Sequence, residues 1–329
     1  MSGVQTIPVD DGEDGVRVDR WFKNHYPGLA HVRLQKLLRS GQVRVNGKRV
    51  KSNTRLEKGQ QLRIPPLAKE KVKDKAAAPK TSKADFRDLR ARVIHKDDDI
   101  IVIDKPAGLA VQGGSGIRKH LDAMLDALCF EAPERPRLVH RLDKDTSGVL
   151  VLARNPVAAR TLTAAFREKK IRKAYWAVVV GLPETEEGMI NLDLAKMSGR
   201  GGERVVIGSP DGKKAQTYFR ILDHAGQKAA WVLFEPLTGR THQLRVHAVA
   251  LGTPIFGDGK YGGREAFLDG GEISGQLHLH ARAMIIPQAK GRVLEVTAPL
   301  PEHFTNTFKA LGFNEKLEQE LFRDFNEIA

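Results

Sequence analysis

Residues 140–152 read HRLDKDTSGVLVL, a cluster of charged and small residues that leads directly into four consecutive apolar residues. An apolar run of this kind, bounded by a turn signal, predicts a strand buried on both faces. The turn before it can present an activated carboxylate beside the strand. It can equally be a charged loop closed by an Asx-type turn and Gly148. The residues alone leave both interpretations open for Asp143, whereas Asp145 is expected to serve the turn.

Other strand-like and helical segments flank this stretch. Strand-like runs cover residues 100–103, 175–180, 216–222 and 231–234, and helical patterns lie near 118–130, 156–168, 241–251 and 302–312. Several of these strands follow one another without an intervening helix. We therefore expect an α+β fold in which residues 88–329 form a domain built on a mixed, mainly antiparallel sheet.

A second polar cluster, TGRTHQLRVH, occupies residues 238–247. Thr241 can cap the helix that follows, and Leu244, Ala248 and Leu251 would form its apolar stripe. Arg245 lies at the edge of that stripe. Its guanidinium can point into the domain and pair with a carboxylate, or it can lie in solvent on the helix flank.

The histidines of the sequence do not follow a metal-binding pattern. His242 and His247 are five residues apart and so differ widely in angle around a helix, and no HExxH motif is present. The single cysteine, Cys129, excludes an internal disulfide framework and a multi-cysteine zinc site. Because no nucleotide-binding motif is present either, we expect no metal and no cofactor.

Charge is distributed unevenly along the chain of 329 residues, whose net charge is +14 and whose pI is about 9.8. Residues 16–66 contain 13 Lys or Arg against two acids, a local balance of +11. Such an excess favours a polyanionic partner. The sequence has no apolar run of about 18 residues and its N-terminus lacks signal-peptide features, so we expect a cytoplasmic protein with no membrane partner.

Residues 16–66 are expected to form a small module of helix and hairpin. Leu34, Leu37 and Leu38 fall on one helical face, and Gly41 is a plausible helix stop. Asn46-Gly47 is a strong hairpin-turn signal. Basic residues lie on the opposite arc of the helix and just beyond the turn: Arg33, Lys36, Arg39, Lys48 and Arg49. These five residues, here called the basic face, are either a solvated surface or an RNA-binding one, and the second cluster at the hairpin favours RNA.

The module resembles the S4 RNA-binding domain over roughly 50 residues, from 18–21 through 32–43 to 45–47. After it, residues 67–87 are expected to be a basic flexible linker. The stretch 67–83 within this range has six lysines, three consecutive alanines and no aromatic residue. Such a composition does not bury enough apolar surface to fold independently.

The two polar clusters together resemble the RluA-type pseudouridine synthase family. The resemblance rests on HRLD and TSG at 140–143 and 146–148, on KAY at 173–175, on GRTHQLRVH at 239–247 and on DKPAG at 104–108. It covers essentially residues 88–300. Residues 110–116 and 45–49 also resemble the branch of this family that acts on the large ribosomal subunit.

The resemblance implies that the protein is an isomerase that converts particular uridines of RNA to pseudouridine without a cofactor. It implies that Asp143 is the catalytic carboxylate, either as a nucleophile on the sugar or as a base that gives a glycal-like intermediate. Arg245 is the implied cationic partner of Asp143, and Tyr175 is implied to stack on the target base. Arg141 is implied to fill the space that the flipped base leaves.

The expected substrate is large-subunit (23S-type) ribosomal RNA, modified by a monomer. One alternative is a synthase of the same fold that acts on transfer RNA or on another RNA. A second alternative is a non-catalytic RNA-binding factor of ribosome assembly, which would not depend on Asp143.

Overall fold

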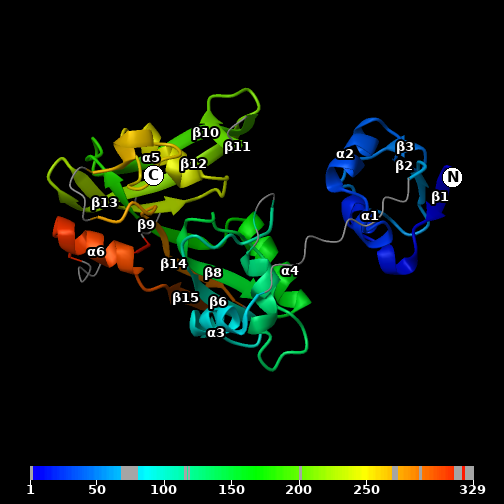
Figure 1. Cartoon of the computed structure of the whole chain (residues 1–329), viewed down its shortest axis with the longest axis horizontal. Coiled ribbons are helices and arrows are strands. Elements are labelled where there is room, and N and C mark those ends of the chain that lie inside the picture. The colour runs from blue at the N-terminus through cyan, green and yellow to red at the C-terminus, as the bar shows by residue number, and fades with distance from the viewer. Residues whose placement is uncertain are drawn as a thin grey trace. The chain divides into compact units, whose positions relative to one another are not determined.

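The computed structural model describes residues 3–67, 81–114, 117, 119–199, 202–268, 273–288, 291–314 and 321–322. The chain divides into two compact units, residues 1–80 and residues 81–329 (Figure 1). Each unit has its own hydrophobic core. None of the described helices is long and apolar enough to cross a membrane.

The first unit packs two helices on a small antiparallel sheet. Its elements are β1 (Gln5–Pro8), η1 (Asp11–Glu13), α1 (Val18–His25), α2 (His31–Arg39), β2 (Arg44–Val45), β3 (Lys48–Arg49) and β4 (Gln61–Ile64), with strand order β1-β4-β2-β3. Trp21, Leu34 and Leu38 lie in its core. The predicted helix stop and hairpin turn are both confirmed, because Gly41 has φ +69° after α2 and Asn46 and Gly47 have φ +46° and +75° between β2 and β3.

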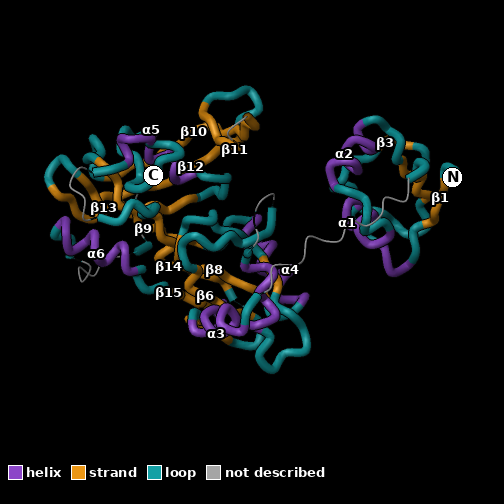
Figure 2. Tube along the Cα trace, viewed as in Figure 1, coloured by secondary structure: helices purple, strands orange, loops and turns teal. Residues whose placement is uncertain are grey.

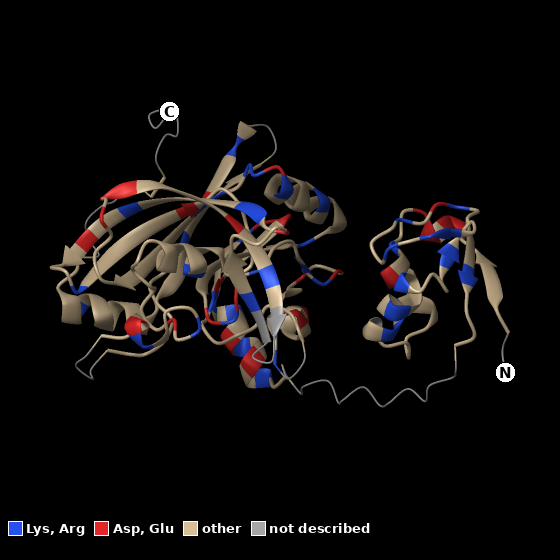
Figure 3. Cartoon of the chain, turned by 90° about the horizontal axis from the view of Figure 1, so that it is seen from above, with Lys and Arg blue, Asp and Glu red and all other residues tan. Residues whose placement is uncertain are grey.

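Four residues of the predicted basic face, Lys36, Arg39, Lys48 and Arg49, are exposed, and Arg33 is partly buried. The end of α2 lies close to the hairpin, since a Cβ atom on Gly41 would be 2.6 Å from Arg49 Nε. The helical and hairpin cations therefore share one part of this unit's surface. Figure 3 shows Lys and Arg on both the helices and the strands of the first unit.

The predicted linker is shorter than expected at its C-terminal end. Residues 68–80 lie outside the described part of the chain, but helix α3 (Lys83–Ala91) begins inside the range 67–87. The Ser82 hydroxyl accepts a hydrogen bond from the Asp85 backbone N–H, and the Asp85 carboxylate accepts one from the Ser82 N–H. This capping box and the burial of Leu89 stabilise a helix that composition alone did not predict.

The second unit is built on one large mixed sheet (Figure 2). Its strands are β5 (Val93–Lys96), β6 (Ile100–Lys105), β7 (Arg137–Leu138), β8 (Ser147–Ala153), β9 (Arg172–Val180), β10 (Glu187–Gly199), β11 (Gly202–Ile207), β12 (Lys213–Ala225), β13 (Ala229–Pro236), β14 (Leu279–Pro287) and β15 (Val293–Thr297). The main order is β11-β10-β12-β13-β9-β14-β8-β6-β5. Among the described strands only β14 and β8 pair in parallel, so the predicted fold class is confirmed.

Helices cover both faces of this sheet. They are α3, η2 (Leu121–Leu128), α4 (Pro156–Arg167), α5 (Gln243–Ala250), η3 (Gly263–Ala266) and α6 (Glu302–Leu311). The helical pattern near 118–130 is a 3₁₀ helix in the structure, and the other three predicted helices are confirmed within a few residues. Every residue of β8 is buried, because α4 packs on one of its faces and η2 on the other.

For helix α5, the predicted apolar stripe is confirmed and the predicted N-cap is wrong. Leu244, Ala248 and Leu251 do pack together in one core cluster, as their spacing predicts. The N-cap of α5, however, is His242 rather than Thr241, and no side chain caps this end. A further helical pattern in the sequence, over residues 313–329, falls largely on residues 315–320 and 323–329, which lie outside the described residues.

Candidate active site

Asp143 lies in the loop between β7 and β8, which a buried lysine holds in place. Lys105 at the end of β6 is fully buried and donates hydrogen bonds to the carbonyl oxygens of Pro106, Leu109 and Lys144, at 2.8, 2.9 and 3.0 Å. Burial lowers the pKa of Lys105 to about 7, although the nearby carboxylates of Asp145 and Asp143 oppose this shift. The loop is thus tied to the neighbouring strand directly beside Asp143.

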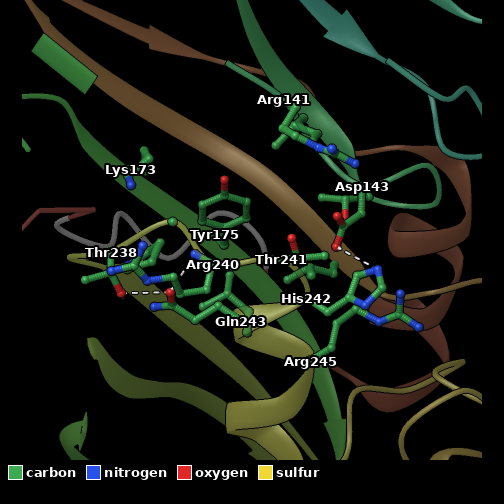
Figure 4. Close-up of a pocket in the computed structure, with 16 residues that line it drawn as sticks. Arg141, Asp143, Lys173, Tyr175, Thr238, Arg240, Thr241, His242, Gln243 and Arg245 are labelled. Carbon is green, nitrogen blue, oxygen red and sulfur yellow. Dashed lines mark hydrogen bonds and ion pairs between the residues drawn. The ribbon is translucent and has the colours of Figure 1, made fainter. Parts of the chain in front are cut away.

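A pocket opens in front of the Asp143 carboxylate (Figure 4). Its walls come from four parts of the chain: the loop before β8, strand β9, the segment from the end of β13 into α5, and Leu279 at the start of β14. Its cavity measures about 130 Å³, close to the size of an engineered cavity of about 150 Å³ that binds benzene. The pocket therefore has room for one six-membered ring. A wider cavity of about 710 Å³ adjoins it and shares Arg141, Leu142, Asp143, His242 and Arg245.

Strand β9 contributes Lys173 and Tyr175, which lie two residues apart and so point to the same face. Burial raises the pKa of the Tyr175 hydroxyl, and the Asp143 charge raises it further. Tyr175 is therefore a protonated phenol at neutral pH. Burial also lowers the pKa of Lys173 to about 8, with a smaller contribution from Lys169. The pocket thus combines the flat aromatic ring of Tyr175 with a lysine that loses its proton more readily than a lysine in water does.

The segment before α5 is fixed by Gln243, whose buried amide makes four hydrogen bonds. Its Oε1 accepts from the Thr238 hydroxyl at 2.7 Å and from the Arg240 N–H at 3.0 Å. Its Nε2 donates to the Gln216 carbonyl and to the Thr217 hydroxyl, each at 2.9 Å. Because Gln216 and Thr217 belong to β12, this amide anchors the polar cluster of residues 238–242 to the sheet.

His242 has a left-handed backbone conformation, with φ +52° and ψ +21°. A non-glycine residue rarely adopts this conformation, because it costs free energy and persists only where the surroundings impose it. The imidazole Nε2 lies 3.9 Å from Oδ2 of Asp143, and the two side chains are 15% and 20% exposed. Nδ1 of the same ring lies 2.6 Å from the Tyr261 hydroxyl. Burial holds the pKa of His242 below its usual value of 6.5, so the ring is neutral at pH 7.

Arg245 points into the domain from α5 and pairs with a carboxylate, but that carboxylate is Asp258. Arg245 Nε and Nη2 donate to Oδ2 and Oδ1 of Asp258 at 2.8 and 2.6 Å, and both side chains are buried. Burial lowers the pKa of Arg245, but hydrogen bonding to Asp258 outweighs it, and Asp143 adds to the net rise. The expected direct pair between Arg245 and Asp143 is therefore replaced by a longer-range interaction, because Asp258 occupies the guanidinium fork.

Comparison with known proteins identifies the family. The family model for RNA pseudouridylate synthases matches residues 99–250, and the model for the S4 domain matches residues 32–62. The ribosomal large subunit pseudouridine synthase C of Vibrio cholerae is 38% identical over 305 residues, which cover 91% of this chain and 94% of that protein. Its namesake from Escherichia coli K12 is 37% identical over 304 residues, which cover 91% and 94%.

The chain belongs to the RNA pseudouridylate synthase family. A solved structure agrees: human RNA pseudouridylate synthase domain containing 4 is 29% identical, with a TM-score of 0.59, and the match covers 69% of this chain and 95% of that one. The protein is thus an isomerase that converts uridine in RNA to pseudouridine, and its first unit contains an RNA-binding S4 domain.

The synthase pocket brings together the four residues that the sequence predicted for it. Asp143, Arg141, Tyr175 and Arg245 all line the pocket, although they come from three distant segments of the chain. Arg141 is exposed at the rim, while the other three are partly or fully buried. The five residues of the basic face belong to the first unit. Within the described part of the chain, no group of three or more potential metal ligands occurs.

Sequence reasoning missed His242, Lys173 and Tyr261. His242 was considered only as a metal ligand, and the enrichment of histidine in left-handed conformations is too weak a signal to mark this position in the sequence. Lys173 was quoted within a motif without a role, and its lowered pKa depends on burial. Tyr261 lies outside every motif considered, and only the fold brings it next to His242.

Proposed function

We propose that this synthase modifies uridines of large-subunit ribosomal RNA and that Asp143 is its catalytic carboxylate. The observation that carries this proposal is the position of Asp143. Its carboxylate borders a ring-sized pocket that also contains the Tyr175 phenol and the Arg141 guanidinium. The relatives from Vibrio cholerae and Escherichia coli, which align with over nine tenths of the chain, are named for the large ribosomal subunit.

The reaction breaks the N-glycosidic bond of uridine and joins the same sugar carbon to C5 of the base. Asp143 either attacks the anomeric carbon or removes a neighbouring sugar proton to give a glycal-like intermediate. Both routes need an ionised, accessible carboxylate. Asp143 accepts no hydrogen bond from another described residue, and its nearest imidazole or cationic nitrogen among them is His242 Nε2 at 3.9 Å. Its lone pairs are thus available to the substrate.

The remaining pocket residues fit distinct tasks. Tyr175 presents a ring on which a flipped base can stack. Because its hydroxyl is protonated at neutral pH, it can assist the loss of the C5 proton only by giving up its own proton in the same step. Arg141, exposed at the rim, can enter the RNA stack where the target base has left it. Arg245 places a positive charge near Asp143 without a direct contact between the two side chains.

In this proposal, the basic face and the pocket together select the RNA substrate. The basic face would hold ribosomal RNA by contacts with phosphates, while the pocket carries out the reaction. The pocket is lined by one chain, so a monomer suffices, and an RNA substrate of the large subunit implies a cytoplasmic enzyme. Activity on transfer RNA or another RNA is the first alternative, and non-catalytic binding during ribosome assembly is the second.

Mapping pseudouridine in the ribosomal RNA of cells tests this proposal. Three strains would carry the wild-type gene, no gene, or the Asp143→Asn variant. Removing the charge of a catalytic carboxylate costs on the order of 10⁴-fold in rate. We expect specific large-subunit sites to be lost in both defective strains and to be present with the wild type.

Asp145→Asn is the matched control, because Asp145 lies in the same loop but does not line the ring-sized pocket. This variant should retain every site. Full modification by Asp143→Asn would remove Asp143 from the catalytic role. An unchanged ribosomal RNA in the strain without the gene would instead point to another RNA or to binding alone.

A further inference from the structure

We propose that His242 is a positioning residue for Asp143, and that Tyr261 fixes the imidazole tautomer on which this role depends. The inference rests on the proposed function of Asp143. It concerns what orients a carboxylate that has no hydrogen-bond partner among the described residues.

The first argument is the hydrogen-bond arrangement around the Tyr261 hydroxyl. The backbone N–H of Val205 in β11 donates to this oxygen at 3.1 Å, and the same oxygen lies 2.6 Å from His242 Nδ1. A phenol that accepts one bond still has its own proton to donate. When Tyr261 donates that proton to Nδ1, the neutral imidazole carries its hydrogen on Nε2, the nitrogen that faces Asp143.

The second argument concerns the charge of the imidazole ring. His242 is surrounded by the carboxylates of Asp143 and Asp258 and by the cations of Arg245 and Lys260. Burial, together with these two cations, holds its pKa below 6.5. The ring therefore offers Asp143 a neutral N–H rather than a full positive charge. A neutral donor can orient a carboxylate without forming a strong ion pair that would weaken its reactivity.

The third argument is that the fold maintains His242 in a strained backbone conformation. The Arg245–Asp258 pair ties α5 to the turn of residues 258–261, and Asp258 Oδ1 also accepts the Tyr261 backbone N–H at 3.2 Å. These contacts set Tyr261 beside the ring of His242. Strain retained at a pocket residue is characteristic of sites where geometry serves the reaction.

The Nε2–Oδ2 distance of 3.9 Å is about 1 Å longer than a direct hydrogen bond. Hydrogen bonds of this kind are often long in the free enzyme and shorten when the substrate fills the site. In the proposed role, this gap closes when the substrate binds. His242 would thus orient the carboxylate during the reaction, with little effect on RNA affinity.

A double-mutant cycle tests this role. His242→Asn removes the imidazole, yet asparagine tolerates the left-handed backbone. Tyr261→Phe removes only the hydroxyl. A misplacement of about 1 Å can cost about 100-fold in rate, so each variant should lower the single-turnover rate by about 10- to 100-fold while the Kd for RNA stays unchanged. If Tyr261 acts through His242, Tyr261→Phe will have no further effect in the His242→Asn background.

Tyr218→Phe is the matched control, because Tyr218 is a buried tyrosine whose hydroxyl donates to Glu187 at 2.7 Å outside the pocket. Its rate should equal that of the wild type. Equal losses from Tyr261→Phe in both backgrounds, or losses confined to the Kd, would overturn the proposed role.

The tautomer is measured separately, in the protein without RNA. ¹⁵N NMR of histidine-labelled protein, with His242 assigned by its loss in His242→Asn, should show the proton on Nε2. Tyr261→Phe should shift the ring toward a mixture of tautomers. A wild-type ring protonated on Nδ1 would refute the inference. Because this measurement needs no RNA, it decides the inference even if the protein proves inactive on ribosomal RNA.

Discussion

At the residue scale, the two carboxylates of the site, Asp143 and Asp258, differ in how closely a cation approaches them. Arg245 and Asp258 form a buried bidentate pair, whereas Asp143 has no arginine or lysine within 4 Å among the residues that the structure describes. The bidentate pair uses two N–H donors of the guanidinium, Nε and Nη2. Arg245 therefore acts on Asp143 by long-range electrostatic attraction and not by a hydrogen bond. The separation lets the fold keep a cation near the Asp143 carboxylate without blocking that carboxylate.

This arrangement predicts the cost of breaking the buried pair. Asp258→Asn leaves the Arg245 charge buried without a counter-charge, and removal of one partner of such a pair costs about 3–5 kcal/mol. We expect the free energy of unfolding, measured by urea denaturation, to fall by that amount. Asp126→Asn serves as the control, because Asp126 and its partner Arg135 are 65% and 43% exposed, and it should cost less than about 1 kcal/mol. Equal losses in the two variants would contradict this account.

The sequence predicted which residues meet in the pocket more reliably than it predicted their contacts. Asp143, Arg141, Tyr175 and Arg245 do meet, because motif resemblance carries the positions of a shared fold. The partner of Arg245 was not predictable, since Asp258 reaches it only after the turn that follows α5 has folded back. His242 was missed for a similar reason: its significance lies in a backbone angle and in Tyr261.

At the element scale, the junction of β8 and β14 places the Asp143 loop. These strands pair in parallel, with His280 opposite Ser147 and Ala281 opposite Gly148. Gly148 has φ +104°, and a Cβ atom there would lie 2.2 Å from the Ala281 carbonyl oxygen. The second residue of β8, directly after the Asp143 loop, is therefore a glycine that no larger residue can replace without a steric clash.

Gly148→Ala should accordingly destabilise the second unit strongly. Backbone strain contributes about 1–3 kcal/mol, and overpacking against the carbonyl contributes a further 1–3 kcal/mol. Thermal unfolding followed by circular dichroism measures the loss. Gly208→Ala separates the two causes, because Gly208 also has a positive φ, +76°, but nothing within 4 Å of an added Cβ; it should cost only about 1–2 kcal/mol. If Gly148→Ala were no worse than Gly208→Ala, the steric argument would fail.

The basic face is a second element-scale feature with a measurable consequence. Lys36 on α2 and Lys48 on β3 are both exposed. If each neutralises one phosphate, replacing both with Gln lowers the slope of log K against log salt by about 1.4 in total, at about 0.7 per single-strand phosphate. RNA binding measured between 50 and 300 mM salt would show this. Lys309→Gln on the exposed part of α6 should leave the slope unchanged, and an unchanged slope in the double variant would exclude these two contacts.

Local signals explain which elements the sequence predicted. Gly41 and Asn46-Gly47 determine backbone geometry by their own chemistry, and both turns formed as expected. The first residues of α3, 83–87, were assigned to the linker because the lysines and alanines of residues 67–83 match a flexible composition. The stability of α3 depends on Leu89 and Phe86 packing against η2, a contact that no local pattern contains. Long-range packing, rather than propensity, decided this boundary.

At the scale of the whole molecule, the second unit contains several buried neutral histidines. Burial lowers the pKa of His140 and His280 to about 3, and that of His247 and His278 to about 4. They occur in the loop before β8, on α5, and in and just before β14. His140 stacks on Phe166 with 4.5 Å between the ring centroids, and the rings of His278 and His280 both contact Phe304. These histidines therefore stay unprotonated in the folded protein at a pH just below 6.5, where the same histidines of the unfolded chain bind protons.

These histidines predict a loss of stability in mild acid. Between pH 6.5 and about 4 the unfolded chain binds more protons than the folded one, so stability falls as the pH decreases, by up to about 1.4 kcal/mol per unit for each histidine. We expect the Tm to drop by roughly 10 °C or more between pH 7 and pH 5. Within the described residues neither ring nitrogen of buried His247 has a hydrogen-bond partner, so His247→Leu removes one titrating group without breaking a bond. That variant should lose less stability between pH 7 and pH 5 than the wild type, and an equal loss in both proteins would show that His247 does not contribute to the acid sensitivity.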